Sequence, residues 1–130
     1  FGRLRTRDEA PNHHALNLKY DAGLPLVEAV RLLSLANGVA VTGTPARLAA
    51  LVERGIVSAD TGETLAAAFA VISGLMLRQQ IADFRAGVSP GYWLDPDSLG
   101  ARERHELIEA LRTIEALRDR VDGDFTAALF

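Results

Sequence analysis

The spacing of apolar residues between Ser58 and Gly87 constrains the fold more than any other feature of this sequence. Apolar side chains recur there in steps of three or four, which is the repeat of one face of an α-helix. Ser58 is a favoured residue at the start of a helix, and Gly87 is favoured just after an end. The pattern predicts one helix of roughly 28 residues, about 42 Å long. Its expected apolar line is Leu65, Phe69, Ile72, Met76 and Phe84.

Two shorter helices are predicted before this long one. Pro25 fits the first turn of a helix, where its missing N–H is not needed, and this helix is expected to end near Ala36. Thr44, which a proline follows, is expected to be the N-cap of a second helix that closes at Gly55. Apolar residues cover most of the first helix, so we expect it to be central and buried.

A last amphipathic helix is predicted from about Ala101 to Val121, with Gly123 ending it. No stretch is long and regular enough to predict a strand. The sequence therefore predicts an all-α fold, a helical bundle of four main helices joined by short loops. The apolar face of the last helix is formed by Leu107, Leu111, Ile114, Leu117 and Val121.

The domain organisation is predicted from where the helical pattern starts. Residues 1–22 are interpreted as an irregular lead-in from an upstream domain, because Pro11-Asn12 breaks the segment. Residues 23–130 are interpreted as one helical domain. The chain begins with Phe1 and its only methionine is Met76, so we expect a piece of a longer protein whose other parts carry the chemistry.

Composition narrows the class of protein. Apolar residues make up 48% and charged residues 24%, which is typical of a globular domain. The net charge of −3 argues against a nucleic-acid partner, which would need a basic face. The longest apolar run, 65–77, is interpreted as too short to cross a bilayer, so no membrane partner is expected. The absence of cysteine fits a cytoplasmic location.

The stretch Asp95-Pro96-Asp97 has the carboxylate spacing with which nucleotidyltransferases and polymerases hold metal ions. Here a proline separates the two acids, and a helix start follows. Ser98 or Gly100 can cap that helix, and Glu103 falls in its first turn, where a negative charge suits the helix dipole. We therefore interpret the two acids as part of a turn and cap, and predict no metal site and no catalytic residue.

Two other clusters have a structural and a functional interpretation. His13-His14 and His105 could contribute to a metal site, but no carboxylate lies at ligand spacing, so a solvated pair is favoured. Tyr92 and Trp93 are more typical of a loop held against the bundle than of a surface on which a base stacks.

Arg31 and Gln80 are the polar residues that stand out within apolar helices. Arg31 has Glu28 one turn earlier, so it forms either a surface ion pair or the cationic group of a cleft that binds phosphate or carboxylate. Gln80 interrupts the apolar line of the long helix. It either holds a neighbouring loop or lines a polar pocket together with Arg78. Both alternatives remain open for both residues.

The segment "LNLKYDAGLPLVEAVRLLSLANGV" (16–39) resembles the opening of a known family, the nucleotidyltransferase substrate-binding domains that form the carboxy-terminal part of the domain-of-unknown-function 294 proteins. Residues 44–87 resemble its next section, a short helix and a long one that ends near Arg-x-Gln. Residues 94–121 resemble its close, a turn that leads into an amphipathic helix. The matched positions of the opening are Leu16, Leu18, Lys19, Gly23, Pro25, Glu28 and Arg31.

The resemblance implies a helical domain of a bacterial multidomain protein related to protein uridylyl- and adenylyltransferases. Such proteins carry a nucleotidyltransferase domain upstream, and before it sensory domains of the cystathionine-β-synthase (CBS) or cyclic-nucleotide-binding type. Mg²⁺ and a nucleoside triphosphate are expected for that parent protein and no cofactor for this chain, with a protein as one candidate acceptor. The polar positions that match the family, and are therefore predicted to bind substrate, are Lys19, Arg31, Arg78 and Gln80.

Two functional hypotheses follow. In the first, the domain helps to bind or orient a substrate for a catalytic domain outside this chain, and Lys19, Arg31 and Gln80 converge on one cleft. The alternative is a regulatory or dimerisation module in signal transduction that makes no substrate contact. A homodimer of that kind would bury an apolar patch in a two-fold interface.

Overall fold

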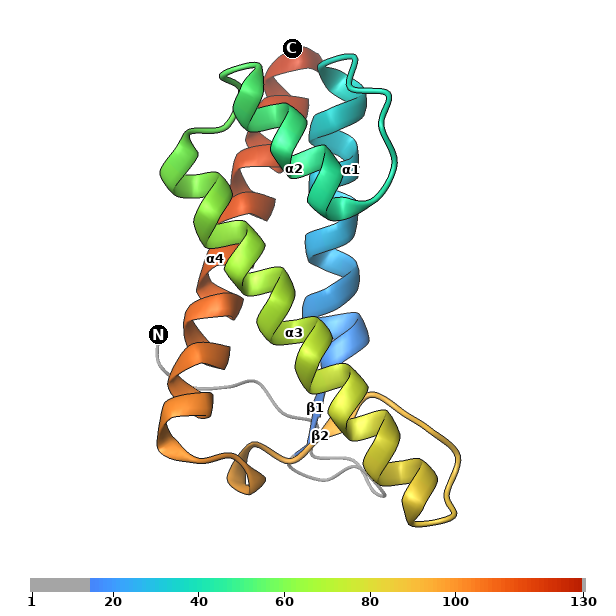
Figure 1. The fold of residues 1–130 in the computed structure, drawn as a ribbon. Coiled ribbons are helices and arrows are strands. Elements are labelled where there is room, and N and C mark those ends of the chain that lie inside the picture. The colour runs from blue at the N-terminus through green and yellow to red at the C-terminus, as the bar shows by residue number, and fades with distance from the viewer. Residues whose placement is uncertain (1–14, 130) are drawn as a thin grey trace.

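The computed structural model describes residues 15–129, with side chains through Ala127. The predicted pair His13-His14 and the first part of the lead-in therefore lie outside the described residues. The fold is an all-α bundle of four helices, as predicted (Figure 1). In chain order its elements are β1 (Leu16–Asn17), the π-helical turn η1 (Lys19–Gly23), α1 (Leu24–Ala36), α2 (Thr44–Glu53), α3 (Ala59–Arg85), β2 (Trp93–Leu94), the 3₁₀ turn η2 (Pro96–Ser98) and α4 (Ala101–Leu129).

The helices enclose a single core. In Figure 1, α1 and α4 stand next to each other, α3 crosses in front of them, and α2 lies over the upper part of α1. The core takes residues from all four helices and from β1 and η1. Its fully buried large side chains include Leu16, Leu18, Leu26, Leu51, Leu65, Ile72 and Leu107.

The start of α3 confirms the predicted cap, since the Ser58 hydroxyl accepts a hydrogen bond of 3.1 Å from the Thr61 N–H. Gly87, with φ of 73°, follows the other end. The prediction is wrong for one residue of the apolar line, because Phe84 is 77% exposed and does not lie in the core. Steps of four residues advance about 40° beyond a full turn, so the line rotates out of the core. The end of α3 also projects past the other helices (Figure 1).

The predicted end of α4 is wrong as well, because the helix continues through Gly123 to Leu129. A glycine inside a helix costs about 1 kcal/mol relative to alanine. Within the continued helix, the Thr126 hydroxyl donates to the Asp122 carbonyl at 2.8 Å, and Phe125 lines a pocket together with Leu33 of α1. A smaller difference is found at α2, where Gly43 takes the N-cap position and Thr44 forms no capping hydrogen bond.

The last part of the predicted lead-in forms a short strand and a helical turn, β1 and η1. β1 pairs with β2 in antiparallel register, Leu16 opposite Leu94, and the Leu18 N–H donates to the Tyr92 carbonyl at 2.8 Å. This pairing confirms that the Tyr92-Trp93 segment holds a loop against the bundle. Leu16, Leu18 and Ala22 belong to the core. Part of the segment 1–22 therefore contributes to the core of the helical domain. The domain boundary at residue 23 stays a prediction.

The helix α3 has one property that the sequence analysis did not anticipate. By length and composition it could cross a membrane, with a mean hydropathy of 1.4 over an 18-residue window. Core helices of soluble proteins pass the same test, although only 22% of this window is buried. The absence of a membrane partner therefore stays a prediction.

Candidate functional site

A cavity lies between η1, the start of α1 and the middle of α3. Its volume is about 230 Å³. Apolar side chains form most of its wall, and Lys19, Ser73 and Tyr92 contribute the polar groups. The lining residues come from segments far apart in the sequence, which the β1–β2 pairing and the packing of α3 against η1 bring together. Its apolar lining is Leu24, Leu26, Val27, Phe69, Ile72 and Met76.

Lys19 supplies the positive charge of this cavity. Its ammonium nitrogen lies 5.0 Å from the ring centroid of Tyr92 and 5.5 Å from that of Tyr20. Cation–π contacts of this length hold the flexible side chain in place. Lys19 also begins the π-helical turn η1. Such turns are rare in proteins, and those that do occur are often found at functional sites.

Two hydrogen bonds fix the turn that carries Lys19. The Tyr20 N–H donates to the Asn17 side-chain oxygen at 3.0 Å, and the Asn17 N–H donates to the Asp21 carboxylate at 3.1 Å. This reciprocal arrangement is similar to a capping box, with the acidic residue four positions after Asn17 and not three. It starts the helix five residues before α1 and thereby places Lys19 beside the cavity.

The cavity floor is formed where α3 crosses η1 closely. A Cβ atom at Gly23 would lie 3.4 Å from the Met76 sulfur, tighter than most contacts of this kind, so the absence of a side chain allows the close approach. The resulting volume is below the roughly 300–1,000 Å³ that is typical of a pocket for a whole drug-sized ligand. The cavity can therefore hold one part of a substrate, with the rest outside it.

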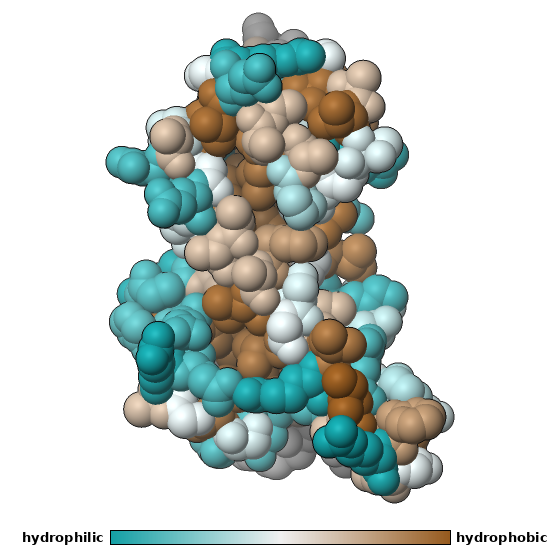
Figure 2. All heavy atoms as spheres, viewed as in Figure 1, coloured by the Kyte–Doolittle hydropathy of each residue, from teal (hydrophilic) through white to brown (hydrophobic). Residues whose placement is uncertain are grey.

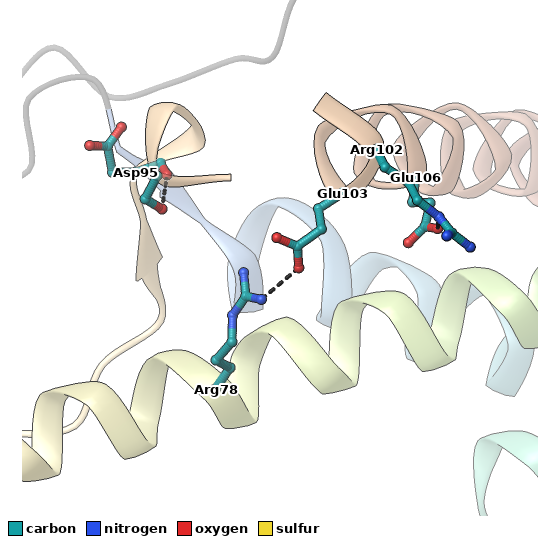
Figure 3. Close-up of polar contacts among 6 residues, drawn as sticks. Arg78, Asp95, Arg102, Glu103 and Glu106 are labelled. Atoms are coloured by element: carbon teal, nitrogen blue, oxygen red, sulfur yellow. Dashed lines mark hydrogen bonds and ion pairs between the residues drawn. The ribbon is translucent and has the colours of Figure 1, made fainter. Parts of the chain in front are cut away.

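Arg78 belongs to a different part of the surface. Its guanidinium donates to the Glu103 carboxylate at 2.5 Å and so joins α3 to the first turn of α4 (Figure 3). The hydrogen bond and the charge of Arg78 hold the pKa of Glu103 below its ordinary value, while partial desolvation opposes them. Arg102 in the same view points to Glu106 on its own helix.

Arg31 and Gln80 do not line the cavity either. Arg31 is exposed on α1, one turn beyond the lining residue Val27, and 12 residues, or about 18 Å of helix, after Lys19. Gln80 is half-buried on α3, one turn after the lining residue Met76. The structure therefore brings Lys19 to the cavity, and none of the other three predicted residues.

The Asp95-Pro96-Asp97 stretch has the predicted role of a turn. The Asp95 side chain accepts from the Asp97 N–H at 2.9 Å and caps the turn η2. Asp97 pairs with Arg104 of α4 at 3.3 Å. Figure 3 shows Asp95 apart from the Arg78–Glu103 pair. Among residues 15–129, no three His, Asp or Glu side chains gather in a way that could hold a metal ion.

A comparison with known proteins shows to which family this chain belongs. A family model described as "Putative nucleotidyltransferase substrate binding domain" matches residues 1–125. The chain belongs to this family. No curated protein and no solved structure matches it.

In this nucleotidyltransferase substrate-binding domain, Lys19 was predicted from the family resemblance and lies at the cavity, whereas its neighbours there were not predicted as site residues. Tyr92 was assigned only to loop packing. Ser73 and Met76 sit on a regular helix and give no local signal of a cavity. The one local signal was Asn17, a residue type favoured at the start of a helix, two positions before Lys19.

Proposed function

We propose that this domain holds part of a substrate for a nucleotidyltransferase catalytic domain outside this chain. The observation that supports the proposal is the cavity whose lining combines Lys19 and Tyr92 with apolar side chains. A cation beside an apolar, partly aromatic slot suits a ligand with a flat apolar part and a negatively charged part. Nucleotides have both parts.

The size of the cavity supports a shared site. About 230 Å³ admits one ring system and leaves the remainder of a nucleotide outside. In the proposed arrangement the catalytic domain binds the triphosphate with Mg²⁺, and this domain orients the other portion of the substrate. The parent would be a cytoplasmic bacterial signalling protein whose sensory domains, of the CBS type, control the transfer to an acceptor.

The experiment is a calorimetric titration of the full-length protein with ATP and with UTP in the presence of Mg²⁺. The Lys19→Ala variant is expected to bind at least about tenfold more weakly, equivalent to about 1.4 kcal/mol. Arg31→Ala is the matched control, because it removes a cation from the same helical segment outside the cavity. Its affinity is expected to change less than about twofold.

Thermal unfolding of each variant shows whether its fold is retained. Unchanged affinity in a folded Lys19→Ala protein would remove Lys19 from any nucleotide site. A loss in Arg31→Ala and not in Lys19→Ala would move the site along α1, away from the cavity. Arg78 and Gln80 stay predictions that the same titration can address.

A further inference from the structure

The helix α3 carries a second apolar face, opposite the one that enters the core. Its buried residues include Leu65, Ile72 and Leu75. At about 100° per residue, the other side of the helix is centred roughly 180° away. The residues on that side, here named the α3 seam, are Ala67, Ala70, Gly74, Leu77, Ile81 and Phe84.

All six residues of the α3 seam are exposed. They follow one another in steps of three, four, three, four and three, which is the a/d repeat of a coiled coil. In Figure 2 tan and brown atoms lie along α3 on this face, and teal atoms lie at its lower tip. The larger side chains are exposed to solvent, Leu77 by 58%, Ile81 by 42% and Phe84 by 77%. An exposed a/d stripe is the signature of a helix that packs against another helix.

The size of the side chains changes along the α3 seam. Its first half is small, from Ala67 to Gly74, and its second half is large, from Leu77 to Phe84. Gly74 stands in the middle of the helix, where it costs stability. A Cβ atom there would meet nothing within 4 Å, so packing inside the chain does not require the glycine.

Two copies placed antiparallel make these halves complementary. With the two-fold axis beside residues 75 and 76, each a position faces a d position of the other copy. Each resulting layer combines a small residue with a large one. The layers are Ala67 with Phe84, Ala70 with Ile81, and Gly74 with Leu77, each pair formed between the two copies.

Charge favours the same orientation. Glu63 precedes the α3 seam and Arg85 follows it, and both are exposed without an ion pair among the described residues. An antiparallel second copy would place Arg85 beside Glu63 of the other chain at both ends. Within one chain the two are 22 residues apart, about 33 Å along the helix, so they cannot meet.

We infer that the α3 seam is the interface for a second copy of this chain, packed antiparallel about a two-fold axis. This inference is independent of the proposed substrate role, because the cavity lies on the inner side of α3. Binding to a lipid surface would explain neither the division of the α3 seam into a small half and a large half nor the opposite charges at its two ends.

The first test measures the dissociation constant of the dimer by sedimentation equilibrium, from micromolar to submillimolar concentrations of the chain. Leu77→Glu is expected to weaken association at least about tenfold. Leu35→Glu is the matched control, because Leu35 is on α1 and 59% exposed, against 58% for Leu77. Its effect is expected to be less than about twofold. A chain that remains monomeric throughout, or equal effects of both variants, would overturn the inference.

Two further variants separate pairing from folding. Gly74→Leu has room within the chain and should not lower its melting temperature, yet it fills the place of Leu77 from the second copy and should abolish the dimer. Arg85→Glu should weaken association, and adding Glu63→Arg should restore it to within about threefold. Failure of the double variant to recover would rule out the antiparallel pairing. Binding to lipid vesicles by the monomer would assign the seam to a membrane instead.

Discussion

Ser34 on α1 is fully buried, and its hydroxyl has no hydrogen-bond partner among the described residues. A buried polar group left unsatisfied costs about 1–3 kcal/mol. Ser34→Ala removes that group and improves helix propensity, against a small loss of packing. We expect the free energy of unfolding in urea to rise by about 1 kcal/mol. A decrease would show that the hydroxyl is satisfied in solution.

The Arg78–Glu103 pair predicts a pH dependence of stability. The pKa of Glu103 is lowered in the folded protein, so its contribution is present above the ordinary value of 4.5 and is lost as the pH falls through the lowered pKa. Glu103→Gln should lower the melting temperature slightly above pH 4.5, and the difference should vanish in stronger acid. Glu106→Gln is the control within α4. A difference that is constant with pH would assign the effect to something other than this charge.

At the scale of single residues, the sequence predicted what depends on near neighbours. Ser58 and Asp95 cap their turns because each meets an N–H two or three residues later. Lys19 was found from a family pattern, whereas its partner Tyr92 comes from a segment 73 positions away along the chain. A contact of that kind depends on the β1–β2 pairing, which short-range patterns do not contain.

At the scale of elements, two glycines of α3 predict opposite effects of the same substitution. Gly62 faces α2, and a Cβ there would overlap the Val52 Cγ2 methyl group, while a Cβ at Gly74 has open space. Overpacking costs about 1–3 kcal/mol, and alanine gains about 1 kcal/mol of helix propensity over glycine. Gly62→Ala should therefore destabilise the chain by about 1 kcal/mol, and Gly74→Ala should stabilise it by about as much.

Urea unfolding measures the free energy of unfolding of both variants. A low protein concentration keeps dimerisation from contributing to it. Adding Val52→Ala to Gly62→Ala should recover part of the lost stability, because it removes the overlapping methyl group. Equal shifts for the two glycine variants would mean that α2 and α3 do not approach as closely as the structure shows.

The ends of helices show how far element boundaries follow from sequence. The bounds of α1, α2 and α3 were predicted to within about two residues, because prolines, Ser58 and glycines act locally. The end of α4 was not, because the helix continues past Gly123, and Phe125 in the continued part lines a pocket together with Leu33 of α1. The local cost of Gly123, about 1 kcal/mol, does not end the helix.

At the scale of the whole molecule, the sequence predicted four helices but not which of their faces remain exposed. Phe84 was expected in the core because it continues the line of Ile72 and Met76. The other helices end before the line reaches it, and α3 projects alone (Figure 1). Exposure at such a position depends on the lengths and placement of other helices, which periodicity within α3 does not contain.

Where the domain begins is tested by the contribution of Leu16 and Leu18, which are 1% and 0% exposed in the common core. Replacing a buried leucine with alanine costs about 2–5 kcal/mol, and a whole domain is stable by about 5–15 kcal/mol. Leu18→Ala should therefore lower the free energy of unfolding by about 2–5 kcal/mol. Tyr20→Ala, 59% exposed, is the control and should lower it by less than about 1 kcal/mol.

A chain that starts at residue 23 loses both leucines and the two hydrogen bonds of Asn17 that fix η1, so it should show no cooperative thermal transition by circular dichroism. The two core side chains alone account for a loss comparable to the stability of a small domain. If the shortened chain instead kept its helical signal and a cooperative transition, the fold would begin at α1. The β1–β2 pairing would then serve only to place Lys19 and Tyr92 beside the cavity.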